Sequence, residues 1–301
     1  MKKAMLYGVA ASFFFAFTFI FNRSMNLSGG YWIWSASLRY FFMLPMLAAL
    51  LAVQRGARFA PVFADIKRQP AAWLVWSTVG FGLFYLPLTL ASVYGESWLT
   101  AASWQITIVV GVLLTPLFGQ RVPLKNLATS CLILVGVFLL QLPNISAGGL
   151  AGSAAALVPI LIAAFSYPLG NRMMMLRCPP EIDTLQRVFG MTLCSMPFWI
   201  AASAYALVRA GLPDAGQTVQ SAVVALFSGV IATALFFHST ELVRGNQRRL
   251  AAVEATQCGE VVFTLLGGIL VLGDPTPNAL GFLGIALIVV GMTAGSLVSG
   301  K

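Results

Sequence analysis

The stretch RRLAAVEATQCGE, residues 248–260, opens an apolar segment that runs to Leu272. Glu260 lies about 11 residues past the arginines, or roughly 16 Å along an α-helix. If the segment spans a bilayer from the arginines onward, this depth is near the middle of a ~30 Å hydrocarbon layer. The segment therefore predicts a membrane helix with a carboxyl group at its midpoint.

One face of this predicted helix is polar. Thr256, Glu260 and Thr264 recur at every fourth residue, and Glu254 and Gln257 precede Glu260 at steps of three. Both spacings bring side chains to one side of a helix. Because ionisable groups inside membranes usually mark substrate or proton pathways, Glu260 is the first candidate for binding substrate or a proton. The alternative is a carboxyl kept protonated by burial and hydrogen-bonded to a neighbouring helix.

The composition is that of a membrane protein. Of 301 residues, 59% are hydrophobic and 9% are charged, whereas about a quarter of the residues in soluble domains are charged. The net charge of +9 comes from basic residues in short clusters between apolar runs, which is typical of topology signals and not of nucleic-acid binding. The four cysteines have no metal-ligand or disulfide spacing, and we expect no metal or cofactor. The run from Ala4 to Phe21 is expected to be an uncleaved first span.

Ten apolar segments are long enough to cross a bilayer. They cover approximately residues 4–22, 31–54, 71–94, 98–118, 125–142, 150–171, 183–208, 218–240, 250–272 and 277–298. With a cytoplasmic N-terminus, every Lys and Arg falls on the inner side except Arg23 and Arg209 outside and Arg39 within a span. This asymmetry supports an all-α protein of ten transmembrane helices with both termini cytoplasmic. Four tryptophans near span ends are expected at the membrane interface: Trp32, Trp34, Trp73 and Trp98.

The two halves of the chain resemble each other. Asn22-Arg23 recurs as Asn171-Arg172, RYFFM at 39–43 matches RVFGM at 187–191, and the turn GQRVP at 119–123 matches GDPTP at 273–277. Because each half holds an odd number of spans, the two copies must be inverted relative to each other. The sequence predicts inverted five-helix repeats over residues 1–148 and 149–301, an architecture of secondary transporters with a site near midplane.

Three passages carry a family resemblance: YGESWLTAAS at 94–103, TPLFGQ at 115–120 and GVFLL at 136–140. They resemble the half-unit of the drug/metabolite transporter superfamily, in its ten-span, EamA-like form. SFFFAFTF at 12–19 and SLRY at 37–40 are similar to the multidrug resistance efflux transporter branch. The resemblance implies a cavity lined by spans one to four and six to nine, with spans five and ten peripheral.

The sequence departs from the family pattern at two places. Many members carry Glu after the glycine of the turn before the fifth and tenth spans, whereas Gln120 and Asp274 stand there, which suggests a structural role. The first span lacks the membrane-embedded Glu of the small four-span exporters, so proton coupling by that residue cannot be carried over. In the tenth span, Gly291 and Gly295 have the GxxxG spacing that favours close helix packing.

Three further side chains are candidates for the substrate site. Arg39, about eight residues into the second span, either reaches back to the headgroups or faces the cavity, where it would balance Glu260 or attract an anionic group of the substrate. Arg187, its counterpart in the seventh span, has the same two interpretations. Trp104, beside Gln105 in the fourth span, can hold a cation against its ring.

Other candidates concern the rim of the site and its movements. Glu254 is shallower than Glu260 and can pair with Arg248 or Arg249, and Gln257 is expected to share the cavity. His238 is either a proton relay or a satisfied helix-end residue. Pro168, beside Tyr167, is either a hinge or a simple kink.

We therefore expect a secondary active transporter, and no enzyme, that exports small amphipathic molecules such as cationic drugs or metabolites by alternating access coupled to protons. Its partners would be the small-molecule substrate, protons and the lipid bilayer of the cell membrane, with no nucleic acid and as a monomer or homodimer. The alternatives are an amino-acid or other metabolite exporter or facilitator, a translocase of lipid-linked substrates, and a receptor that transports nothing. GSLVSGK at 295–301 has phosphate-loop spacing but no flanking strand and helix, so it predicts no ATPase.

Overall fold

The computed structural model describes the chain except at residues 54–58, 120, 123, 244–245 and 300–301. The described residues form helices and turns, without a strand among them. The α-helices are α1 (Lys2–Leu27), α2 (Trp32–Val53), α3 (Phe59–Arg68), α4 (Pro70–Ser77), α5 (Leu83–Tyr94), α6 (Ser97–Trp104), α7 (Ile106–Leu113), α8 (Leu124–Arg177), α9 (Thr184–Cys194), α10 (Met196–Ala210), α11 (Ala215–Val224), α12 (Thr233–Glu241), α13 (Gln247–Ala255), α14 (Gly259–Gly267) and α15 (Ala279–Ser299). Three π-helical segments, η1 (Thr78–Gly82), η3 (Ala225–Ala232) and η5 (Gly268–Leu272), and two 3₁₀ turns, η2 (Thr115–Phe118) and η4 (Thr256–Cys258), interrupt them.

The prediction of an all-α membrane protein is confirmed. Within the described residues, seven helices are long and apolar enough to cross a membrane, or eight if the bent pair α9 and α10 forms one span. This pair meets at an angle of 41°. Two of the expected spans correspond to shorter apolar helices, Ser97–Leu113 and Leu127–Pro143. The count of ten therefore stays a prediction.

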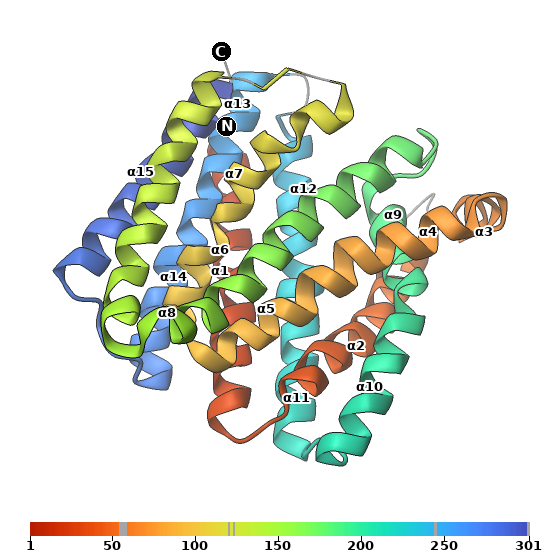
Figure 1. Ribbon diagram of the computed structural model, residues 1–301. Helices are drawn as coiled ribbons and strands as arrows, with labels where there is room; N and C mark the ends of the chain where they lie inside the picture. The colour runs from red at the N-terminus through yellow and green to blue at the C-terminus, as the bar shows by residue number, and fades with distance from the viewer. Residues whose placement is uncertain (54–58, 120, 123, 244–245, 300–301) are drawn as a thin grey trace.

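The helices pack as one bundle (Figure 1). α8 starts near the two termini, runs beside α15, reverses its direction and returns beside α5 and α7 (Figure 1). α1 contacts α2 and α5 from the first half of the chain, and α11, α12 and α14 from the second half. The first helix is therefore packed between elements of both halves of the chain.

Polar residues in the turns begin several of these helices. Asp183 accepts a hydrogen bond from the backbone N–H of Gln186 at 2.8 Å and forms a capping box with it. Asp214 accepts from the backbone N–H of Gln217 at 2.8 Å in the same way. Each cap satisfies a donor at a helix start that has no partner within its own helix. These caps fix where α9 and α11 begin.

One element was not expected from the sequence. This element is α3, which lies between α2 and α4 in the chain. Its Asp65 is buried. The Asp65 carboxylate accepts hydrogen bonds from Arg68 at 2.5 Å, Gln69 at 2.8 Å and the indole N–H of Trp73 at 3.0 Å. This bond and the packing around it hold the Trp73 ring fully buried in the protein. Its expected position at the membrane interface stays a prediction.

Glycines allow the closest helix crossings. A Cβ atom on Gly170 of α8 would lie 2.3 Å from the backbone of Gly80 in η1. Where α8 crosses α15, a Cβ atom on Gly136 would lie 2.6 Å from the carbonyl oxygen of Gly284. Gly291 also packs tightly against α8, with its Cβ position 2.9 Å from Ile133. The close packing that the GxxxG spacing predicted for the last helix is therefore present.

Several residues named from the sequence lie outside the part of the chain that the structure describes. Gln120 and Pro123 of the predicted turn lie there, as do Arg55, Arg58, Arg244 and Lys301.

The crossing of α8 and η1 gives a first testable prediction. We expect Gly170→Ala to destabilise the protein by roughly 1–3 kcal/mol, because the new methyl group overlaps backbone atoms that cannot rotate away. Thermal denaturation in detergent, followed by size-exclusion chromatography, measures the loss. Gly95→Ala is the matched control, since a Cβ atom there meets its nearest neighbour at 3.5 Å and φ is −145°. Equal melting temperatures for the two variants would contradict the predicted clash.

Candidate functional site

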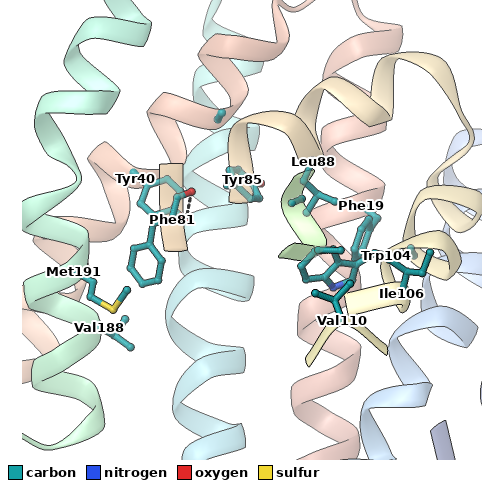
Figure 2. Packing of buried hydrophobic residues seen from close by; sticks show 14 of the residues in the cluster. Phe19, Tyr40, Phe81, Tyr85, Leu88, Trp104, Ile106, Val110, Val188 and Met191 are labelled. Atoms are coloured by element: carbon teal, nitrogen blue, oxygen red, sulfur yellow. Dashed lines mark hydrogen bonds between the residues drawn. The ribbon is translucent and has the colours of Figure 1, made fainter. Parts of the chain in front are cut away.

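A cavity of about 740 Å³ lies within the bundle. This volume is in the range of small-molecule sites. Aromatic side chains make up much of its wall: Phe15, Phe19, Tyr40, Phe81, Phe84, Trp104, Tyr167, Phe236 and Phe237. Figure 2 shows several of these among the buried core residues, with Tyr40 and Phe81 in one group and Phe19, Leu88 and Trp104 in another. Part of the wall thus belongs to the packed core, and the aromatic wall residues come from helices and not from loops.

The cavity belongs to one end of the bundle. Its wall includes residues of α13, of the first turns of α8 and of the last turns of α15, and these segments lie toward the end that carries both termini (Figure 1). Among the described residues, none from 22–32, 92–98, 205–218 or 268–280 lines it. These four segments form the opposite end, which is therefore closed in this conformation.

The structure brings most of the candidate residues together. Glu260, Glu254, Gln257, Arg39, Trp104, Tyr167 and Pro168 all line the cavity. They come from α2, α6, α8 and the segment α13–η4–α14, which are far apart in the sequence. Arg187 lines it as well, from α9.

Two candidates lie elsewhere. The Thr256 side chain is buried and donates to the carbonyl oxygen of Val253 at 2.6 Å, and its hydroxyl packs against Gly8 of α1. Thr256 lies in the 3₁₀ turn η4, on the side that packs against α1, where Gln257 donates to its hydroxyl at 3.4 Å. His238 lines a separate recess and packs edge-on against Tyr7, with ring centroids 4.9 Å apart.

Glu260 is partly exposed to the cavity. Its Oε2 accepts a long hydrogen bond of 3.5 Å from the amide of Gln105, whose Nε2 also donates to the carbonyl oxygen of Ala101 at 3.1 Å. Gln257, one turn away, donates to the carbonyl oxygen of Gly8 at 3.4 Å. The carboxyl group is therefore held by one weak contact and remains available to a ligand or a proton.

Arg39 is 8% exposed and does not reach back to the headgroups. Its Nη2 donates to the hydroxyl of Ser228 at 3.2 Å, and that hydroxyl lies 2.5 Å from the hydroxyl of Thr18. The guanidinium carbon lies 4.0 Å from the centroid of the Tyr85 ring, a cation–π contact. Among the described residues no hydrogen-bond partner exists for Nε or Nη1 of Arg39, and no carboxylate lies within 4.0 Å of the guanidinium.

The partners of Arg39 were not found from the sequence. Ser228 and Thr18 are single hydroxyl residues in apolar segments, and nothing in their spacing singles them out. Tyr85 is fixed by Asn22, which donates to its hydroxyl at 3.1 Å and accepts from it at 3.2 Å. Only the packing of α1, α2, α5 and η3 places these side chains around one guanidinium.

Breaks in the helices gather at the cavity wall. Phe81 lies in η1, Ser228 in η3, Gln257 in η4 and Gln105 between α6 and α7. π-helical turns are frequent at functional sites because they turn side chains out of the regular helical register.

Pro168 adds a break of another kind. It has no N–H to donate to the carbonyl oxygen of Ala164, and the hydroxyl of Thr107 donates to that oxygen instead, at 3.3 Å. The lost backbone bond of α8 is therefore replaced by a side chain of α7.

The expected peripheral position of the fifth and tenth segments is only partly correct. Thr129, Ser130 and Ile133 of α8 contribute to the cavity wall, as do Gly291, Met292, Gly295 and Ser296 of α15. Their small and polar side chains face inward, and the glycines of α15 let the two helices lie close together there.

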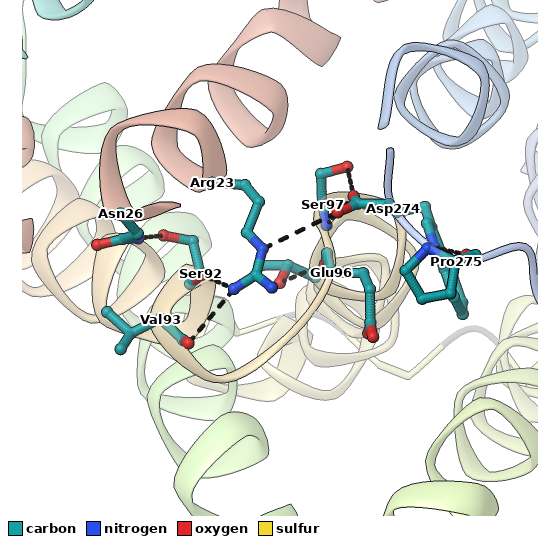
Figure 3. A network of polar contacts seen from close by, with 10 residues as sticks. Arg23, Asn26, Ser92, Val93, Glu96, Ser97, Asp274 and Pro275 are labelled. Atoms are coloured by element: carbon teal, nitrogen blue, oxygen red, sulfur yellow. Dashed lines mark hydrogen bonds and ion pairs between the residues drawn. The ribbon is translucent and has the colours of Figure 1, made fainter. Parts of the chain in front are cut away.

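Polar contacts join the two halves of the chain at the closed end (Figure 3). Asp274, in the turn after η5, accepts hydrogen bonds from the backbone N–H and the hydroxyl of Ser97 at 3.0 and 2.6 Å. Arg23 of α1 lies 4.0 Å from the other Asp274 oxygen and donates to the carbonyl oxygens of Ser92 and Val93 at 3.3 and 3.4 Å. Asp274 thus also caps the start of α6.

Comparisons with known proteins agree with this architecture. The model of the family described as "EmrE: Putative multidrug resistance efflux transporter" matches residues 2–301. The "Uncharacterized protein YjlA" of Bacillus subtilis (strain 168) is 50% identical over 305 residues, which cover 96% of this chain and 93% of that protein. The "Uncharacterized 42.1 kDa protein in intracellular alkaline protease 3'region" of Shouchella clausii is 43% identical over 272 residues, covering 86% and 70%.

A solved structure described as "Crystal structure of protein" aligns with a TM-score of 0.63 at 15% identity, over 99% of this chain and 98% of the other, and shows a similarity of fold. The family match, in contrast, extends over almost every residue of the chain. The chain therefore belongs to the multidrug resistance efflux transporter family of the drug/metabolite transporter superfamily, a family of multi-pass membrane transporters of small molecules.

Proposed function

We propose that the protein is a secondary active transporter that exports small amphipathic molecules from the cytoplasm by alternating access, coupled to protons. The observation that carries the proposal is the one-ended cavity, which holds Glu260 and Arg39 on an otherwise largely aromatic wall. An amphipathic molecule fits such a wall, because apolar groups contact the rings while polar groups bind the few charged side chains.

Alternating access requires two units that rock against each other around the site. We assign these units to residues 1–148 and 149–301, in opposite orientations. Recurring irregularities support the assignment: η1 and η3 are π-helical breaks in the third and eighth expected spans. The paired turn glycines Gly119 and Gly273 both have left-handed backbones, with φ of 71° and 69°.

The conformation described here corresponds to the state open toward the cytoplasm. The distribution of lysines and arginines supports cytoplasmic termini, and the cavity extends toward the end that carries the termini. In this state a substrate enters from the cytoplasm and displaces the proton from Glu260. The protein then opens to the outside and releases the substrate. A proton binds Glu260 from the outside and is carried inward when the protein returns to the state open toward the cytoplasm.

Proton coupling through Glu260 is tested by Glu260→Gln. The amide keeps the shape of the side chain but binds no exchangeable charge, so we expect pH-driven transport to fall by about tenfold or more. A screen of deletion and overexpression strains at two external pH values first identifies an exported compound. Its flux into everted vesicles is then measured with and without a pH gradient.

Glu181→Gln is the matched control for this experiment. Glu181 is an exposed carboxylate between α8 and α9, at the end of the bundle that carries the cavity mouth, and it does not line the cavity. Its variant should transport like the unmodified protein. Undiminished pH-driven flux in Glu260→Gln, at equal amounts in the membrane, would exclude the proposed role of this carboxyl.

The contacts of Asp274 act as the outer gate in this scheme. They are among the polar links between the halves at the closed end, together with the bonds of Gln217 to Tyr31 and of Trp34 to Gly211, and they must separate before a substrate can leave in that direction (Figure 3). The pair with Arg23 is well shielded, since the Asp274 side chain is only 3% exposed. Loss of the Arg23–Asp274 pair should therefore shift the population of the protein toward the outward-open state.

Asp274→Asn tests this gate. We expect a cysteine placed at Leu88, on the cavity wall, to react with a membrane-impermeant thiol reagent added outside roughly fivefold faster or more than in the parent, since a buried charged contact is lost. The four native cysteines are first replaced. Glu96→Gln is the control, because the Glu96 side chain points away from the network (Figure 3). Equal labelling rates in Asp274→Asn and the parent would rule out a gating role.

A further inference from the structure

The charge on the cavity wall limits what the substrate can be. Among the described residues that line the cavity, the charged ones are Arg39, Arg172, Arg187, Glu254 and Glu260. Three guanidinium groups thus face two carboxyl groups. Protonation of either carboxyl makes the wall more positive still, which disfavours a substrate that carries only positive charge.

Arg39 is the charged group with the most unusual surroundings. Of the five N–H donors that a guanidinium offers, the structure shows one in use, on Ser228. The side chain is more than nine-tenths buried and Nε and Nη1 have no partner among the described residues. A buried cation without an acceptor is costly, and the Tyr85 ring compensates for only part of that cost.

The arrangement leaves room for a carboxylate. A guanidinium has two edges on which a carboxylate binds through two parallel N–H···O bonds. Ser228 occupies one donor, so at least one edge stays open. Because Arg39 lines the cavity, the missing acceptor can come from a molecule in the cavity. Glu260 does not supply it, since it makes no ion pair with Arg39 within 4.0 Å.

We propose that Arg39 binds an anionic carboxylate group of the substrate, so that the exported molecules are amphipathic acids or zwitterions rather than simple cations. The inference rests on the proposed function only in taking the cavity as the substrate site. The apolar body of the molecule lies against the aromatic wall around Phe84, Trp104 and Tyr167, whose rings contact one another at centroid distances of 4.8–5.7 Å. In a zwitterion, the amino group then faces Glu260.

Binding to the purified protein in lipid nanodiscs, without any gradient, tests this inference. The probes are 3-phenylpropionate, phenylalanine, hexanoate and 2-phenylethylamine, which separate the carboxylate from the amine and from the aromatic body. We expect at least one carboxylate probe to raise the melting temperature and to titrate in calorimetry. Arg39→Gln should weaken its affinity by about tenfold or more and leave the affinity for the amine unchanged or increased.

Two further variants keep the result interpretable. Arg39→Lys retains the positive charge but lacks the planar guanidinium, so it should keep part of the affinity for the carboxylate. Partial binding by this variant shows that position 39 tolerates substitution without misfolding. Arg209→Gln removes an exposed arginine outside the cavity wall and should bind like the parent.

The inference is wrong if no carboxylate probe binds at millimolar concentration, or if Arg39→Gln binds the carboxylates as tightly as the parent. Because no gradient is present, either result leaves the role of Glu260 in proton coupling to be judged by its own transport assay.

Discussion

A backbone that crosses lipid must satisfy its N–H and C=O groups within the protein, because no water is there to replace a lost bond. The described helices obey this constraint, and three of their five η segments lie where the chain meets its internal cavity. η1, η3 and η4 each contribute a side chain to the cavity wall. At Pro168 the lost backbone bond is replaced by the hydroxyl of Thr107. Irregular backbone thus occurs beside the cavity, where polar groups are available to stabilise it.

α1 connects the parts of the molecule that the proposed mechanism needs. Thr18 belongs to the hydroxyl pair that holds Arg39, and Asn22 fixes the tyrosine under its guanidinium. Arg23, at the next position, contacts Asp274 at the closed end. The α1 residues that contact the surroundings of Arg39 and the α1 residue that contacts Asp274 are therefore less than two helical turns apart on one helix. A shift of α1 between the halves would change both together.

The sequence predicted the class of protein and part of the site for simple physical reasons. Long apolar runs predict membrane helices, and a run interrupted by Glu254, Gln257 and Glu260 at helical spacing predicts a polar face, which does line the cavity. The same periodicity did not separate Thr256, whose side chain is buried against Gly8 of α1 instead of lining the cavity. It also left two interpretations for Arg39, since a long cationic side chain can turn toward either the headgroups or the protein.

Sequence alone determined the all-helical membrane fold and the family, because hydropathy and local motifs are properties of neighbouring residues. The tertiary structure decided which polar groups meet. The surroundings of Arg39 come from α1, α2, α5 and η3, and the Asp274 contacts join residues more than half the chain apart, so no local pattern encodes them. The physical reason is that a buried polar group is stabilised by partners that packing brings close, and packing joins segments that are distant in the chain.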